Sequence, residues 1–259
     1  MQSNEKLPPF VPVRTIVDTG HGSTPERLTT VAVSLYNYES HIGECLDSVA
    51  SQTRHGLDLI VVDDCSKDGS LSVAERWFAS HGGRFHRARL VQTVQNSGLA
   101  AARNTAFAAV ATPYVFVLDA DNAIFPPCIE RLEAALEDSE ATFAYSYIQK
   151  FGTVSAVLNI GSWNADRLRL SNYIDAMVLM RREAWRVAGG YRKMRVTGWE
   201  DYQHWLDLSI RGGRGIQVHE FLCRYRVHGE SMLHQITMKP ENYEVVLDEI
   251  RGSNPEFFA

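Results

Sequence analysis

The sequence predicts an α/β protein in which a Rossmann-like, mostly parallel central sheet is flanked by helices. Short apolar runs rich in β-branched residues alternate with helical segments over residues 30–137, which is the order expected of βαβ units. The runs are almost continuously apolar, as in strands that are covered on both faces. Three of them end in polar residues, and ligands of such sheets bind at the carboxyl ends of the strands.

Four strands are predicted first, from their apolar and β-branched content, at residues 30–35, 57–62, 88–93 and 114–118. Helices are predicted between and after these strands, from helical spacing or high alanine content, at residues 39–51, 70–79, 98–110 and 126–137. Pro126 and Pro127 suit the first turn of the last helix, where the N–H that proline lacks would have no partner.

The second half of the chain is less regular. Its elements are a hairpin, a short apolar run, a short helix, an amphipathic helix and one or two strands, at residues 141–160, 175–180, 182–188, 200–210 and 215–226. We interpret residues 1–28, which hold four of the nine prolines, as an extended arm or a linker. Residues 29–235 are expected to form one catalytic domain, and residues 236–259 a C-terminal tail.

Composition and charge narrow the class of protein. The 259 residues are 45% hydrophobic and 22% charged, which is ordinary for a globular protein with a core. The formal net charge of -5 argues against nucleic-acid binding through the overall field. The four cysteines form no C-x-x-C pair, so neither a zinc site nor a disulfide framework is predicted. Without an apolar run of membrane-spanning length or a signal peptide, we expect a cytoplasmic protein.

Two acidic pairs follow predicted strands. Asp119 and Asp121, separated by one alanine, can place oxygens around Mg²⁺ or Mn²⁺, although D-x-D also occurs in ordinary turns. Asp64, which follows Asp63, can accept hydrogen bonds from a nucleoside, or it can simply cap a turn. A receiver domain also carries an acidic pair, but that fold is about half this length.

Three further candidates lie near helix or strand ends. Gly98 permits a tight turn before a helix N-terminus that can bind an anion, and Arg103 lies more than one turn further on. Glu200 and Asp201 begin a predicted helix, whose dipole stabilises acidic residues, and Asp201 can alternatively act as a general base. His228, just beyond a predicted strand, is either structural or a metal ligand.

The order of the motifs is more informative than any one of them. Seven segments succeed one another: VAVSLYNY (31–38), LIVVDDCSKDGS (59–70), NSGLAAARNTA (96–106), YVFVLDADN (114–122), AMVLMRREAWRVAGGY (176–191), GWEDYQHWLDL (198–208) and YRVHGESM (225–232). Together they resemble the family 2 glycosyltransferases of GT-A fold over residues 29–235. Family 2 enzymes are inverting, use nucleotide-diphosphate sugars and bind a divalent metal.

The resemblance implies a nucleotide-binding set. Ser34 and Tyr36 would contact the nucleoside, with Tyr36 near the base. Asp64 would hydrogen-bond the base, and Gly98 and Arg103 would lie along the nucleotide and its diphosphate.

It also implies a metal and catalytic set. Asp119 would face the ribose or the donor sugar and would also belong to the metal set. Asp121 would ligate the metal, and His228 would complete its shell. Asp201 would be the catalytic base, with Glu200 beside it.

One departure from the family pattern concerns Ser34, which occupies a position where the family often has proline; we expect only a small local change.

The resemblance also implies that Ser231 would approach the phosphates of the donor.

The implied activity is metal-dependent transfer of a sugar, with UDP as the commonest donor base and Mn²⁺ or Mg²⁺ as the cofactor, to a hydroxyl of a saccharide or glycolipid. An acceptor of this kind would bring the enzyme to the inner face of the membrane. Two alternatives stay open at this stage. A sugar nucleotidyltransferase usually carries a Gly- and Arg-rich loop after its first strand, where this chain has Tyr36-Asn-Tyr-Glu39. A non-catalytic nucleotide- or carbohydrate-binding module is the other.

Overall fold

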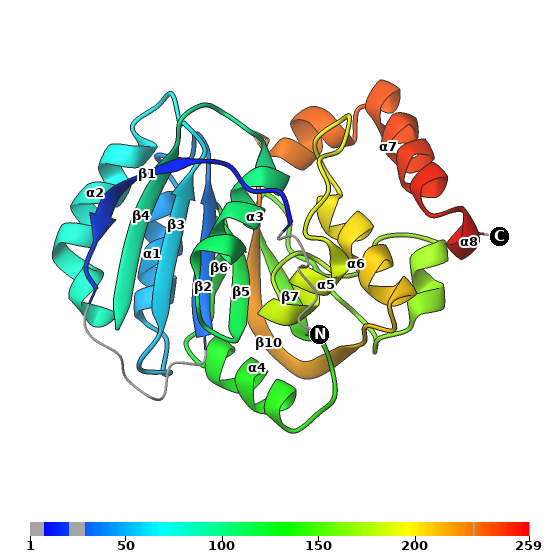
Figure 1. Ribbon diagram of the computed structural model, residues 1–259, viewed down its shortest axis with the longest axis horizontal. Helices are drawn as coiled ribbons and strands as arrows, with labels where there is room; N and C mark the ends of the chain where they lie inside the picture. The colour runs from blue at the N-terminus through cyan, green and yellow to red at the C-terminus, as the bar shows by residue number, and fades with distance from the viewer. Residues whose placement is uncertain (1–7, 21–28, 230, 259) are drawn as a thin grey trace, which may run out of the picture.

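The computed structural model of the chain describes residues 8–20, 29–229 and 231–258. Across these residues the strands form one sheet, in the order β1-β4-β3-β2-β5-β9-β7-β10-β6, with β8 paired to β7. Four neighbouring strands are parallel to one another and lie side by side in Figure 1: β2 (Thr29–Leu35), β3 (Asp58–Asp63), β4 (Arg87–Thr93) and β5 (Tyr114–Asp119). They confirm the predicted parallel centre.

Five further strands continue the sheet beyond β5: β6 (Ala123–Ile124), β7 (Phe143–Gly152), β8 (Val157–Leu158), β9 (Leu179–Arg181) and β10 (Gly215–Val227). β9 is antiparallel to both β5 and β7 and so joins the two halves of the sheet. β7 and β8 pair antiparallel, which confirms the predicted hairpin. The segment predicted as one or two strands is the single strand β10, irregular in its pairing with β7.

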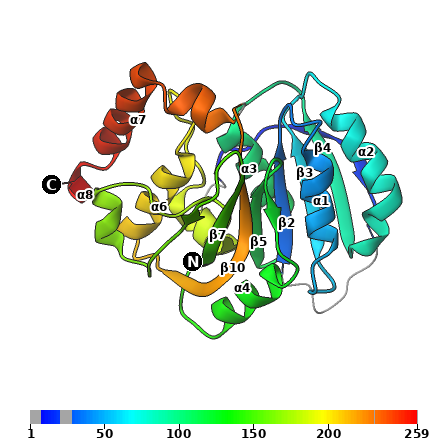
Figure 2. The ribbon, with the colours of Figure 1, turned by 180° about the vertical axis from the view of Figure 1, so that it is seen from behind.

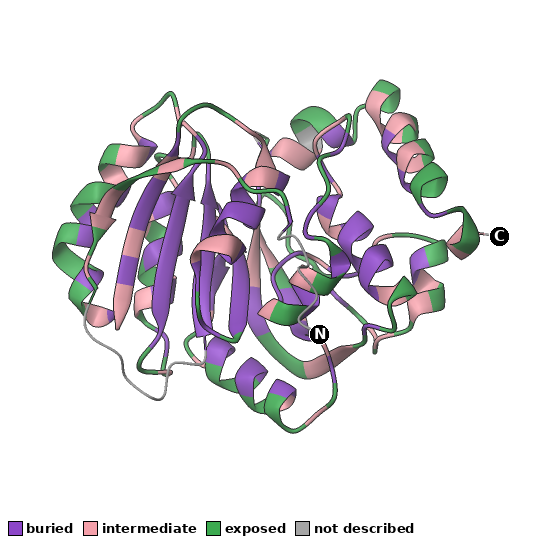
Figure 3. Ribbon diagram, in the orientation of Figure 1, coloured by how far each residue is buried: buried purple, intermediate pink, exposed green. Residues whose placement is uncertain are grey.

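Helices cover both faces of the sheet, as Figures 1 and 2 show from opposite sides. One face carries α1 (Ile42–Ala50), α2 (Ser70–His81) and α4 (Cys128–Glu137), and the other carries α3 (Leu99–Ala109), α5 (Arg182–Ala188) and α6 (Glu200–Ile210). Successive strand residues point to opposite faces, so Val31 and Val33 pack in the first core while Ala32 and Ile60 pack in the second. The buried strands between exposed helix surfaces are visible in Figure 3.

Short helical turns complete the described elements: η1 (Gly82–Arg84), η2 (Ala165–Arg169) and the π-helical η3 (Leu233–Thr237). Pro127 is the N-cap residue of α4, so the two prolines precede that helix instead of forming its first turn. Within the described ranges, no helix combines the length and the apolar character that crossing a membrane requires.

Two terminal segments differ from the sequence-based expectation. Part of the predicted arm is the strand β1 (Val13–Asp18), which pairs antiparallel with β4 and forms the edge of the sheet. The rest of the arm prediction falls mainly on residues outside the described ranges. The predicted tail contains α7 (Pro240–Ser253) and α8 (Pro255–Phe258). Val246 and Ile250 of α7 are fully buried in the second core, so this helix belongs to the domain.

A buried asparagine fastens α3 to the second half of the chain. The side chain of Asn104 donates to the backbone oxygen of Tyr191 at 2.9 Å. Its Oδ1 accepts from Nε1 of Trp185 at 2.9 Å and from the backbone N–H of Tyr191 at 2.8 Å. Satisfied buried polar groups of this kind fix one relative placement of the elements they join.

Strand register then sets where polar side chains meet. Ser34 pairs with Asp119 across β2 and β5, and Leu35 pairs with Asp63 across β2 and β3. The carboxyl ends of the parallel strands therefore bring residues from distant parts of the chain to one edge of the sheet.

Candidate active site

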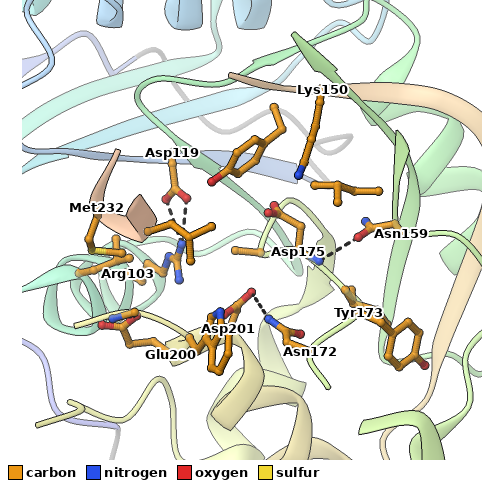
Figure 4. A pocket seen from close by; sticks show the side chains of 18 residues that line it. Arg103, Asp119, Lys150, Asn159, Asn172, Tyr173, Asp175, Glu200, Asp201 and Met232 are labelled. Atoms are coloured by element: carbon orange, nitrogen blue, oxygen red, sulfur yellow. Dashed lines mark hydrogen bonds and ion pairs between the residues drawn. The ribbon is translucent and has the colours of Figure 1, made fainter. Parts of the chain in front are cut away.

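Two cavities lie at this edge of the sheet. The larger, of about 460 Å³, is lined by residues that include Ser34, Tyr36, Asp64, Gly98, Asp121 and Ser231. The smaller, of about 240 Å³, is lined by residues that include Arg103, Asp119, Lys150, Asp175, Glu200 and Asp201 (Figure 4). Asp119, Leu99, Tyr225, Met232 and Leu233 line both cavities. The two cavities are therefore adjoining parts of one site, and Asp119 lies at their junction.

Asp64 organises the turn that precedes α3. Its carboxylate accepts hydrogen bonds from the hydroxyl of Thr93 at 2.8 Å and from the backbone N–H groups of Ser97 and Gly98 at 2.9 and 2.7 Å. Gly98 has a φ of 90°, a conformation that favours glycine. A carboxylate offers about four acceptor positions, so three protein donors leave room for one ligand donor. The neighbouring Asp63 is fully buried and accepts from Nε2 of Gln92 at 2.6 Å.

Ser34 and Tyr36 also line the larger cavity. Ser34 is the penultimate residue of β2, and Tyr36 follows the strand with 40% of its surface exposed. An exposed aromatic ring at the mouth of a cavity can stack against a planar ligand. The structure thus brings Ser34, Tyr36, Asp64 and Gly98 together around one cavity.

Arg103 forms an ion pair with Asp119 across the junction. Its Nη2 lies 3.0 and 3.1 Å from the two carboxylate oxygens of Asp119, and its guanidinium packs on the ring of Tyr191. Burial alone would lower the pKa of Arg103, but the charge of Asp119 and of the neighbouring acidic groups outweighs it, so the pKa lies above its ordinary value. Arg103, which the resemblance placed along the nucleotide and its diphosphate, is buried and lines the smaller cavity next to the junction.

Asp121 and His228 form a second polar pair, beside the larger cavity. Nε2 of His228 lies 3.0 Å from Oδ2 of Asp121. Arg226 holds the Asp121 segment in place, because its Nε donates to the backbone oxygen of Asp121 and its backbone N–H donates to Oδ1 of Asn122, both at 2.9 Å. Tyr38 packs edge-on against the His228 ring, with ring centroids 5.9 Å apart.

The chemistry of this pair fits a divalent ion that is shared with a ligand. In the part of the chain that the structure describes, no three His, Cys, Asp or Glu side chains group closely enough to hold a metal ion alone. Mg²⁺ and similar ions are commonly held by one or two carboxylates together with phosphate oxygens of a substrate. One carboxylate of Asp121 and one imidazole of His228 are a donor set of that incomplete kind.

Glu200 and Asp201 begin α6 but differ in their surroundings. Glu200 is buried, and its Oε2 accepts from the backbone N–H of Gly198 at 3.0 Å, so it supports the turn before the helix. Asp201 lines the smaller cavity (Figure 4), and its Oδ2 accepts from Nδ2 of Asn172 at 3.0 Å. Burial raises the pKa of Asp201, while the nearby charge of Arg103 and the Asn172 hydrogen bond oppose that rise.

Asp175 was not among the residues that the sequence singled out. It precedes β9 in a short apolar run and lines the smaller cavity with Lys150, Asn159 and Asn172. Burial first, and the charge of Asp201 second, raise the pKa of Asp175 to about 7. Its ionisation therefore lowers the stability of the fold as pH rises from 3.8 towards about 7. The signal that could have found it is a single carboxylate inside an otherwise apolar segment.

Solved structures of transferases share this arrangement of elements. A structure of S. aureus TarS in complex with UDP-GlcNAc aligns with a TM-score of 0.71 and 17% identity, over 90% of this chain and 70% of that one. A mannosyltransferase from Pyrobaculum calidifontis, solved with GDP-Man and Mn²⁺, aligns with a TM-score of 0.60 and 21% identity, over 89% of this chain and 71% of that one. The fold is that of the GT-A glycosyltransferases.

The sequence comparisons agree with the fold. Residues 30–188 match the family model described as glycosyl transferase family 2. The chain belongs to glycosyl transferase family 2, and it is a transferase enzyme.

Its relatives include EpsE of Bacillus subtilis, which is named a glycosyltransferase and is 29% identical over 76% of this chain and 72% of EpsE. Chondroitin synthase of Escherichia coli is 24% identical over 86% of this chain but only 32% of its own length.

The carboxyls of the smaller cavity can be tested by titration. In a ¹³C NMR titration of aspartate-labelled protein, we expect Asp201 to titrate above the ordinary value of 3.8 and Asp175 near 7. Asp18, whose hydrogen bond with Arg87 lowers its pKa, provides an internal reference below 3.8. Signals are assigned by substituting each aspartate with asparagine. If Asp201 titrated together with Asp18, the electrostatic description of the cavity would be wrong.

Proposed function

We propose that this enzyme is a metal-dependent, inverting glycosyltransferase that moves a sugar from a nucleotide-diphosphate sugar, with UDP as the nucleotide, to a hydroxyl of a saccharide or glycolipid. One observation carries the proposal. A cavity lined by Tyr36, Asp64 and Asp121 adjoins a second cavity that holds Asp201, and Asp119 lines both. A nucleotide-diphosphate sugar that spans this junction has its base at one end and its anomeric carbon at the other.

The larger cavity supports the nucleotide half of the proposal. Tyr36 offers a ring for stacking on the base, and the remaining acceptor position of Asp64 suits an N–H of the base. The solved relatives named above were crystallised with a UDP-sugar and a GDP-sugar, which supports a donor of this class.

Asp121 and His228 would hold the divalent ion, as Mn²⁺ or Mg²⁺, next to the diphosphate. The bound ion would supply charge that stabilises the leaving diphosphate. Arg226 fixes the backbone that carries Asp121, so the carboxylate is positioned before the donor binds. The Mn²⁺ in the mannosyltransferase structure supports this cofactor.

Asp201 would remove the proton from the acceptor hydroxyl. The hydrogen bond from Asn172 orients its carboxylate, and its raised pKa brings its basicity closer to what proton transfer near neutral pH requires. The acceptor oxygen would attack the anomeric carbon as the bond to the diphosphate breaks. Attack from the face opposite the leaving group inverts the configuration, and holding both substrates in line lowers the barrier further.

Family membership supports transfer over the two alternatives that the sequence left open, nucleotidyl transfer and binding without catalysis. The name of chondroitin synthase supports a growing saccharide as the acceptor.

Replacing the proposed base tests the mechanism. Asp201→Asn should lower kcat by about 10²- to 10⁴-fold, the usual contribution of a positioned base. It should leave the Kd for UDP within about twofold, because Asp201 does not line the larger cavity. Transfer is followed by UDP release and UDP binding by calorimetry. The matched control is Asp138→Asn, at an exposed position just after α4. Wild-type turnover in Asp201→Asn would refute the base assignment.

Removing the metal tests the cofactor. Chelation with EDTA should abolish transfer and added Mn²⁺ should restore it. His228→Ala should raise the Mn²⁺ concentration for half-maximal activity by about 10- to 100-fold, the usual cost of weakening a metal site. His55→Ala, at an exposed position after α1, should leave that concentration unchanged. Full activity in EDTA, or an unchanged Mn²⁺ requirement in His228→Ala, would contradict the proposed metal site.

A further inference from the structure

Asp175 presents one carboxylate oxygen for a ligand in the smaller cavity. Its backbone N–H donates to Oδ1 of Asn159 at 2.9 Å, and its own Oδ1 accepts from the backbone N–H of Met177 at 2.9 Å. Asn159 is buried, and its Nδ2 donates to the backbone oxygen of Ser146 in β7 at 3.1 Å. Among the described residues, Oδ2 of Asp175 has no hydrogen-bond partner. The segment is thus fastened to the sheet while one oxygen stays available.

A second acceptor lies in the same cavity. Asn172 donates through Nδ2 to Asp201, and its Oδ1 is buried without a hydrogen-bond partner in the described part of the chain. Trp199 lines the cavity as well and offers an apolar face. Carboxylate and amide oxygens accept hydrogen bonds from hydroxyl groups. The wall around Asp175 is therefore suited to a ring that carries hydroxyls.

The smaller cavity is lined by more carboxylates than cations. Its charged lining residues are the two cations Arg103 and Lys150 and the four carboxylates Asp119, Asp175, Glu200 and Asp201. Arg103 is already paired with Asp119. Lys150 remains as the cation opposite three carboxylates, and in the described structure no ion pair joins it to Asp175. Figure 4 shows Asp175, Asp201 and Lys150 around the same cavity.

A carboxylate brought into this cavity by a ligand would meet like charges at short range, where repulsion is little screened. Burial first, and the charge of Asp201 second, raise the pKa of Asp175 to about 7, so part of this shift reflects the acidic surroundings. An uncharged ring that carries hydroxyls is not repelled by these carboxylates.

We propose that Asp175 binds a hydroxyl of the transferred sugar and makes the enzyme selective for donors with an uncharged sugar over donors with a uronic acid. This inference rests on the proposed function and adds to it the class of sugar and a residue that determines it. A site built to hydrogen-bond a hydroxyl discriminates strongly, because its polar groups are left unpaired by the wrong ligand.

The test compares donors and variants. Hydrolysis of UDP-glucose, UDP-galactose, UDP-N-acetylglucosamine, GDP-mannose and UDP-glucuronate is measured with Mn²⁺ at about pH 8.5, where a carboxyl of pKa about 7 is ionised. The variants are Asp175→Asn and Asp175→Ala. Asp166→Asn, with a largely exposed side chain outside both cavities, is the control.

The wild-type enzyme should cleave its best uncharged-sugar donor at least about tenfold better, in kcat/KM, than UDP-glucuronate. Asp175→Ala should lower kcat/KM for that donor about 10- to 100-fold, the cost of one lost hydrogen bond to a buried group, with the Kd for UDP unchanged. Asp175→Asn keeps an acceptor for Met177 and so retains the fold. Asp175→Asn also removes the negative charge. The ratio of kcat/KM for the best uncharged-sugar donor to kcat/KM for UDP-glucuronate should therefore fall about tenfold in this variant.

Two results would overturn the inference alone: UDP-glucuronate as the best donor of the wild-type enzyme, or unchanged kcat/KM values and donor preference in both Asp175 variants. In either case a wild-type enzyme that cleaves donors, and loses this activity in Asp201→Asn, would leave the proposed function standing. A folded wild-type enzyme that cleaves none of the five donors would refute the proposed function and this inference together.

Discussion

The ion pair between Arg103 and Asp119 is the interaction on which the rest of the site depends. A buried guanidinium without a partner is strongly destabilising, so Arg103 requires a carboxylate at the end of β5. The pair lies where the two cavities adjoin and offsets one of the four carboxylates of the smaller one. The positive charge of Arg103 also opposes the rise that burial causes in the pKa of Asp201. Without it, Lys150 would be the one cation, among the described residues that line this cavity, to face four carboxylates.

The fold brings this pair together with a carboxylate from the second half of the chain. Asp119 ends a central parallel strand, Arg103 belongs to the helix that precedes that strand, and Asp201 lies in the first turn of α6, in the second half of the chain. Asn104, the residue after Arg103, ties α3 to the segment before α6 through buried hydrogen bonds. Two adjacent residues of α3 thus connect the two halves of the site. Arg103 does so through its ion pair with Asp119, and Asn104 through its buried hydrogen bonds.

Much of this could be predicted from the sequence, because strands buried on both faces and polar residues at their carboxyl ends are local patterns. What could not be predicted depends on tertiary contacts. β1 is a half-exposed edge strand with no apolar alternation, and α7 buries few apolar residues, chiefly Val246 and Ile250. The partners of Arg103 and Asp64, and the cavity that Asp175 shares with Asp201, each join residues of different segments. No spacing rule within a segment contains that information.

The two cavities adjoin, and we propose that they bind one donor, with its nucleotide in the larger cavity and its reacting carbon beside Asp201 in the smaller one. Crystals grown with UDP and Mn²⁺, with diffraction measured at the manganese absorption edge, would locate both the ion and the nucleotide. We expect an anomalous peak bonded to Asp121 and His228, with the uracil ring beside Tyr36 and Asp64. A peak away from that pair, or a nucleotide bound outside the larger cavity, would refute the proposed donor site.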